Sequence, residues 1–127
     1  MRIATSCLAL LALATALPAA AAEPPAATAV VCTSIQNNAC EGADVNFSSD
    51  VGKLWGFSQV ANVPDKLVHV WFYKDKELGR LEMRAPNAPR WRTWSNVTIA
   101  KNMTGAWRLE ARDGSGKVLA SFAFAIQ

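Results

Sequence analysis

The chain has 127 residues, 51% of them hydrophobic, and a formal net charge of +3. Arg2 is the one charged residue among the first 22, so the rest of the chain carries +2. This excess is too small for the basic stripe with which proteins bind nucleic acid or anionic membranes, and neither partner is expected.

The N-terminus has the pattern of a secretory signal peptide. Arg2 precedes an apolar run at residues 7–17, CLALLALATAL, and an Ala-x-Ala site follows. We predict cleavage before Glu23, which removes residues 1–22 and leaves a periplasmic or secreted protein. The run is about half as long as a membrane-spanning helix, so no membrane span is expected after cleavage. A lipoprotein signal ending at Cys7 is the weaker alternative, because it leaves almost no apolar region before the cysteine.

The mature chain begins with a short spacer and a cysteine pair. Residues 23–28, EPPAAT, are typical of a flexible Pro/Ala spacer, which leaves residues 29–127 as a single domain. Cys32 and Cys40 form an even pair in an oxidising compartment, so we predict a structural disulfide. Closing this short loop stabilises the fold by roughly 2 to 3 kcal/mol. The spacing differs from the Cys-x-x-Cys of redox proteins.

Apolar residues then alternate with polar ones in several short segments. These segments are residues 30–35, 54–60, 67–73, 78–85, 106–112 and 118–126. Turn-forming residues separate them at 74–77, 85–89 and 113–116. About seven short strands without helices predict an all-β fold, a small antiparallel β-sandwich of immunoglobulin-like kind. A small barrel is the alternative.

The same alternation predicts which side chains face away from the core. In the segment 67–73, the even-numbered residues are Val68, Val70 and Phe72, which we assign to the core. The candidate ligand-binding residues are the aromatic and basic side chains assigned to outward faces. They are His69, Trp71, Tyr73, Arg84, Arg92 and Trp94.

Such a face can bind in two ways. Flat aromatic rings pack on sugar faces or apolar side chains, and arginine forks bind carboxylates and phosphates. A structural role competes, because a tryptophan on a central sandwich strand is often a core residue. We therefore keep Trp71 and Trp107 as core candidates, and Trp94 with Arg92 as either a packing lid or a binding site.

Nothing in the sequence indicates catalysis. His69 is the one histidine, and no serine, carboxylate pair or glycine-rich loop lies in a catalytic motif. Met83 and Met103 have no ligand-like spacing to the histidine or the cysteines. We expect no catalytic residue, no metal and no cofactor.

Four motifs resemble a bacterial family known as domain of unknown function 2914. They are His69-Val70-Trp71, Trp91-Arg92-Thr93-Trp94-Ser95, Gly105-Ala106-Trp107-Arg108 and the closing run Gly116–Phe122. Their order and intervals are similar to the family's over residues 54–127. Upstream, this chain has Asn37-Asn38-Ala39-Cys40 where family members carry a Pro-containing segment. The resemblance implies an envelope-associated β domain and no activity.

Together these features favour an exported, non-catalytic binding module of the bacterial envelope, with a glycan or polymer as ligand. The alternative is an accessory subunit that docks on an envelope protein complex through its face or a strand edge.

Overall fold

The computed structural model describes residues 11–14 and 23–127, which form eleven β-strands. The predicted signal peptide and Cys7 lie outside the described residues, apart from residues 11–14. No helix in the described part of the chain is long and apolar enough to cross a membrane. The strands are β1 (Ala26–Ala27), β2 (Val30–Cys32), β3 (Ser34–Gln36), β4 (Ala39–Glu41), β5 (Asn46–Phe47), β6 (Lys53–Ala61), β7 (Lys66–Tyr73), β8 (Lys76–Arg84), β9 (Trp91–Thr98), β10 (Gly105–Asp113) and β11 (Val118–Ile126).

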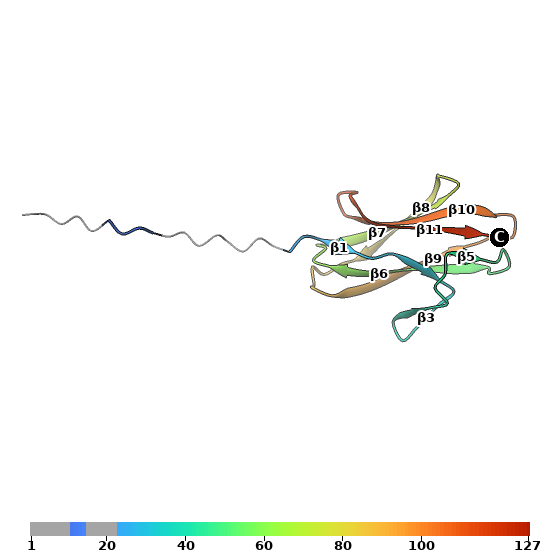
Figure 1. The fold of residues 1–127 in the computed structure, drawn as a ribbon, viewed down its shortest axis with the longest axis horizontal. Helices are drawn as coiled ribbons and strands as arrows, with labels where there is room; N and C mark the ends of the chain where they lie inside the picture. The colour runs from blue at the N-terminus through green and yellow to red at the C-terminus, as the bar shows by residue number, and fades with distance from the viewer. Residues whose placement is uncertain (1–10, 15–22) are drawn as a thin grey trace, which may run out of the picture.

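Two sheets pack face to face, which confirms the predicted all-β sandwich (Figure 1). In one sheet, β6 pairs with β1 and β2 along one edge and with β9 along the other. The second sheet has the order β5-β11-β10-β7-β8. The chain changes sheet between β5 and β6, between β6 and β7, between β8 and β9, and between β9 and β10, as in immunoglobulin-like sandwiches. The β3–β4 hairpin projects from the layer that holds β6 (Figure 1).

The N-terminal part is divided more finely than predicted. The expected strand at residues 30–35 is interrupted at Thr33, and five strands of two or three residues precede β6, so the total exceeds seven. The spacer predicted for residues 23–28 joins the sheet at β1, whose alanines pair with the end of β6. Ala26 is the first residue after Pro24 and Pro25 with a backbone N–H to donate, so pairing starts there.

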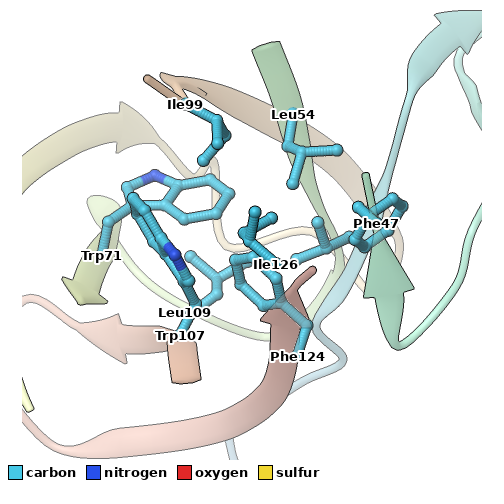
Figure 2. Packing of buried hydrophobic residues seen from close by; sticks show 9 residues of the cluster. Phe47, Leu54, Trp71, Ile99, Trp107, Leu109, Phe124 and Ile126 are labelled. Carbon is cyan, nitrogen blue, oxygen red and sulfur yellow. The ribbon is translucent and has the colours of Figure 1, made fainter. Parts of the chain in front are cut away.

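Aromatic and aliphatic side chains fill the space between the sheets. Nine buried residues form the main cluster, in which Trp71 and Trp107 pack around Phe124 (Figure 2). A second cluster lies toward the other end of the sandwich. It consists of Val60, Val63, Leu67, Ala85 and Ala111.

Gly56 on β6 lets the Trp71 ring fit between the sheets. A Cβ atom at this position would lie 2.6 Å from Leu109 Cδ2 and 2.8 Å from Trp71 Cζ2. Both distances are shorter than any ordinary carbon–carbon contact, so a larger residue here would push the ring or the sheet aside.

Two tight hairpin turns place both of their central residues at positive φ. Asn37 and Asn38 have φ values of 51° and 58°, and Lys74 and Asp75 have values of 48° and 63°. Both pairs form two-residue loops of the kind whose twist matches the flanking strands. The segment Asn37–Cys40 therefore forms the tip of the β3–β4 hairpin and most of its second strand.

Candidate binding surface

The structure corrects the predicted facing of β7. His69 and Trp71 point into the sandwich and are 0% and 4% exposed, so neither lies on an outer face. Tyr73 is half-buried; its Oη donates a hydrogen bond to the carbonyl oxygen of Thr104 at 2.7 Å, and its ring lies 4.9 Å from that of Trp107. These three residues, offered as ligand-binding candidates, instead belong to the interior side of the sheet.

Hydroxyl groups from the facing sheet explain why a histidine can lie inside. Ser58 Oγ on β6 is 2.7 Å from His69 Nε2, and Ser95 Oγ on β9 is 2.7 Å from Nδ1. Trp71 Nε1 donates to the same Ser95 oxygen at 3.2 Å. Burial lowers the pKa of His69 from 6.5 to about 4, so the ring is neutral near pH 7.

The residues assigned to the core are on the outer side of β7, under a charged cover. Val68, Val70 and Phe72 form their own buried cluster. The guanidinium carbon of Arg108 lies 4.1 Å from the centre of the Phe72 ring, and Glu110 forms salt bridges with the arginines beside it. Both faces of β7 are thus buried, and apolar alternation alone does not identify the inner one.

Arg92 and Trp94 do share an outer face, as predicted. On β9, Ser95 and Val97 point into the sandwich, whereas Arg92 and Trp94 lie opposite Gln59 and Phe57 of β6. The Trp94 ring stacks on Phe57, with centroids 6.2 Å apart and planes 8° apart. Trp94 therefore packs on Phe57 and is half-buried rather than covered.

Two adjacent hollows surround these side chains. The larger has a volume of about 480 Å³, and its lining includes Asn38, Gln59, Arg90, Trp91, Arg92 and Trp94. The smaller, of about 240 Å³, is lined by Arg84, Trp91, Arg92, Thr93 and Trp94. We call Arg84, Arg90, Trp91, Arg92 and Trp94, with Asn38 and Gln59, the β9 surface. It brings together Arg84, Arg92 and Trp94 of the predicted set and excludes His69, Trp71 and Tyr73.

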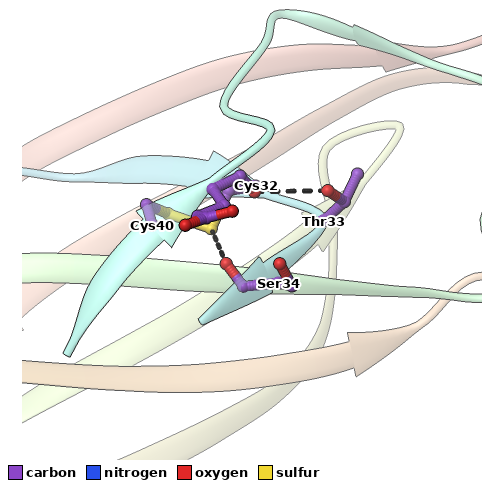
Figure 3. The surroundings of a disulfide bond; sticks show 5 residues. Cys32, Thr33, Ser34 and Cys40 are labelled. Carbon is purple, nitrogen blue, oxygen red and sulfur yellow. Dashed lines mark hydrogen bonds between the residues drawn. A yellow bond between two sulfur atoms is a disulfide. The ribbon is translucent and has the colours of Figure 1, made fainter. Parts of the chain in front are cut away.

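The β3–β4 hairpin forms one wall of the larger hollow. The predicted disulfide is present, with Cys32 Sγ and Cys40 Sγ 2.03 Å apart, and it ties β4 to the end of β2 (Figure 3). At the tip of the hairpin, the carbonyl oxygen of Asn38 accepts a hydrogen bond of 3.4 Å from Arg92 Nη1. The disulfide and this contact together hold Asn38 over β9.

Four residues of the β9 surface were missed from sequence. Arg90 and Trp91 belong to the run Arg90-Trp91-Arg92-Thr93-Trp94, whose density of arginine and tryptophan was an available signal. Trp91 is 38% exposed, and its Nε1 donates to the carbonyl oxygen of Arg84 at 3.0 Å. Asn38 and Gln59 had no local signal, because they reach the site only through the hairpin and the β6–β9 pairing.

The chemistry open to this surface is stacking and hydrogen-bond donation. Among the described residues that line the two hollows, none is Asp, Glu, His or Cys. The lining thus offers guanidinium and amide donors beside aromatic faces, without a carboxylate or imidazole that could transfer a proton. Over the described residues, no group of three or more His, Cys, Asp or Glu is placed to hold a metal ion.

Fold and surface together define a β-sandwich domain with an aromatic and basic surface patch. The family model described as "Protein of unknown function (DUF2914)" matches residues 64–126, which confirms the resemblance to this family that the motifs predicted. The match includes β7 to β11, and therefore Arg84 to Trp94, but not the β3–β4 hairpin.

Comparison with other proteins adds a structural likeness to solved structures. No curated protein matches the chain. Among solved structures, a selenomethionine-labelled beta-glucosidase from Kluyveromyces marxianus is similar with a TM-score of 0.47 and 8% identity. The alignment covers 82% of this chain and 14% of that one, so the chain spans a small part of the enzyme's length.

Proposed function

We propose that this chain is an exported, non-catalytic module of the bacterial cell envelope that binds a glycan or related polymer at the β9 surface. The observation that carries the proposal is that Trp91, Arg92 and Trp94 line both of two adjacent hollows. Indole faces pack on sugar rings, and guanidinium groups donate paired hydrogen bonds to oxygen acceptors.

Export is supported by the sequence of the predicted signal peptide and by the disulfide bond. The charged start, apolar run and Ala-x-Ala site of residues 1–22 fit a cleaved secretory signal. The Cys32–Cys40 disulfide suits an oxidising compartment such as the periplasm or the exterior. We therefore propose a periplasmic or secreted location.

A retention experiment tests the proposed site. The full chain, produced with its own N-terminal segment and purified oxidised, is passed over immobilised envelope polysaccharides and peptidoglycan fragments. We expect retention by a saccharide, and its loss in Trp94→Ala.

The matched control is Trp55→Ala. Trp55 is a half-buried tryptophan on β6 that lines neither hollow. This variant should be retained like the wild type. Retention of Trp94→Ala on every saccharide that holds the wild type would contradict the proposed site.

A second candidate function, docking on a protein, is favoured by the free edges of the sandwich. Within the described part of the chain, β8 pairs only with β7 and β9 only with β6. A hollow of about 400 Å³ lies between them, lined in part by Leu78 and Leu81, which are 44% and 46% exposed. Unpaired edges beside apolar side chains accept an added strand. Capture of one envelope protein, lost in Leu81→Arg and kept in Trp94→Ala, would favour this function.

A further inference from the structure

The arginines of the described part of the chain fall into two groups by their partners. Three have a carboxylate within salt-bridge distance and belong to the sheet that holds β7. These are Arg80 with Glu77, Arg108 with Asp75 and Glu110, and Arg112 with Glu110. The other three, Arg84, Arg90 and Arg92, have no carboxylate partner in the part that the structure describes, and all three line the hollows of the β9 surface.

This distribution gives the β9 surface an excess of positive charge that the chain itself does not neutralise. Like charges gathered on one surface repel one another, and a bound anion relieves that repulsion. Guanidinium groups also match the planar shape of a carboxylate and can donate two parallel hydrogen bonds to it. The charge pattern therefore favours an anionic ligand over a neutral one.

The two hollows share one set of side chains and each add an arginine, an arrangement that fits a ligand with repeated units. The larger, about 480 Å³, lies within the ~300–1,000 Å³ usual for small-ligand pockets, whereas the smaller, about 240 Å³, lies below it. They share Trp91, Arg92 and Trp94. Each also has an arginine of its own, Arg90 in the larger and Arg84 in the smaller. One ligand that continues from the larger hollow into the smaller would contact all three arginines.

Building on the proposed function, we infer that the ligand is an acidic oligosaccharide of at least two sugar units, each with a carboxylate, and that one unit lies in each hollow. Arg90 and Arg92 bind the carboxylate in the larger hollow, and Arg84 binds the one in the smaller. Trp91 and Trp94 pack against the sugar faces. The side-chain amides of the larger hollow, on Asn38 and Gln59, hydrogen-bond to sugar hydroxyls.

Binding of four defined probes to the oxidised full chain tests this inference. The probes are galacturonic acid, digalacturonic acid, tetragalacturonic acid and the neutral maltotetraose, measured by calorimetry at low and high salt. We expect the di- and tetramer to bind about tenfold or more tightly than the monomer, and maltotetraose to bind at least about tenfold more weakly than tetragalacturonic acid. Affinity for the acidic probes should fall as salt rises.

Arginine variants then assign the units to the hollows. Arg84→Gln should weaken the dimer about tenfold and leave the monomer unchanged, because the monomer uses the larger hollow. Arg90→Gln should weaken both probes. Arg80→Gln is the matched control, since its guanidinium pairs with Glu77 and lines neither hollow; it should bind like the wild type.

Each contrary result identifies which claim fails. If maltotetraose and tetragalacturonic acid bind equally and Trp94→Ala loses both, the claim that the ligand is acidic is wrong. The proposed function would still stand. Equal affinity for monomer and tetramer, or Arg84→Gln behaving like Arg80→Gln, overturns the two-unit arrangement. Failure of all four probes overturns this inference, and failure of the immobilised envelope saccharides as well overturns the proposed function with it.

Discussion

The Nδ1 atom of His69 lies 2.7 Å from the Oγ atom of Ser95, and this contact joins the two sheets inside the domain. Ser95 Oγ also accepts from Trp71 Nε1, so its own proton is available to donate to Nδ1. A neutral ring then donates from Nε2 to Ser58 Oγ. The two hydroxyls therefore satisfy both nitrogens of a neutral ring, and burial makes the charged imidazolium costly at this position.

Stability should therefore fall as the pH drops through the range in which only the unfolded chain binds a proton. Burial holds the pKa of His69 at about 4 in the folded state against 6.5 when exposed. Between these values the unfolded state binds more protons, so the free energy of unfolding decreases with decreasing pH, by about 3 kcal/mol in total. Above pH 6.5 this contribution is constant. Urea unfolding from pH 4 to pH 8 measures the slope.

The control for this prediction is His69→Gln, which removes the chain's one histidine. The amide can still offer a donor and an acceptor to Ser58 and Ser95, but it does not titrate. The variant should unfold at lower urea, with a flatter pH dependence between pH 4.5 and 6.5. An unchanged slope would show that other groups cause the acid sensitivity.

Gly56→Ala should destabilise the domain, because its new methyl group would overlap Leu109 and Trp71 at 2.6 and 2.8 Å. Overpacking of this kind costs about 1 to 3 kcal/mol. Gly79→Ala, on the edge strand β8, is the matched control, since a Cβ there meets nothing within 4 Å. It should leave the midpoint of thermal unfolding nearly unchanged. Equal losses of stability in the two variants would mean that Gly56 is needed for its backbone freedom and not to avoid contact with Trp71.

The sequence pattern correctly predicted the inward face of a strand where the other face is polar. In β10, Trp107, Leu109 and Ala111 alternate with charged residues and point inward as expected. The same reasoning failed for β7, because its outer apolar side chains are hidden under Arg108 and its neighbours. The β7–β10 register pairs Leu109 with Trp71, so the pairing would have identified the inner face.

The candidate site was predictable in part for a similar reason. Arg92 and Trp94 stand two residues apart on one strand, so their shared face follows from the period of a β-strand. Arg84 comes from the other sheet and Asn38 from a hairpin far along the chain, and only the folded arrangement brings them beside β9. Spacing along the sequence carries no information about such contacts.

Removal of the disulfide should weaken both stability and binding. Cys32→Ser with Cys40→Ser opens a link between cysteines eight residues apart, which the loop-entropy relation values at about 2.5 kcal/mol. The Asn38 wall of the larger hollow would then lose its covalent link to β2 and keep its 3.4 Å contact with Arg92 and the hydrogen bonds at the base of the hairpin. Urea unfolding measures the first effect. Retention on the saccharide that holds the wild type, at a temperature where the variant is folded, measures the second. Full retention would show that the hairpin is not part of the site.

Trp94 and Trp107 should separate binding from stability. Trp107 is 2% exposed in the main core cluster and its Nε1 donates to the carbonyl oxygen of Met103 at 2.9 Å, so Trp107→Ala should cost about 3 to 5 kcal/mol. Trp94 is half-buried and packs on Phe57 alone among the aromatic rings, so Trp94→Ala should cost about 1 kcal/mol. Thermal unfolding measures both losses, and saccharide retention should disappear only in folded Trp94→Ala. A loss near that of Trp107→Ala would make Trp94 a packing lid rather than a binding residue.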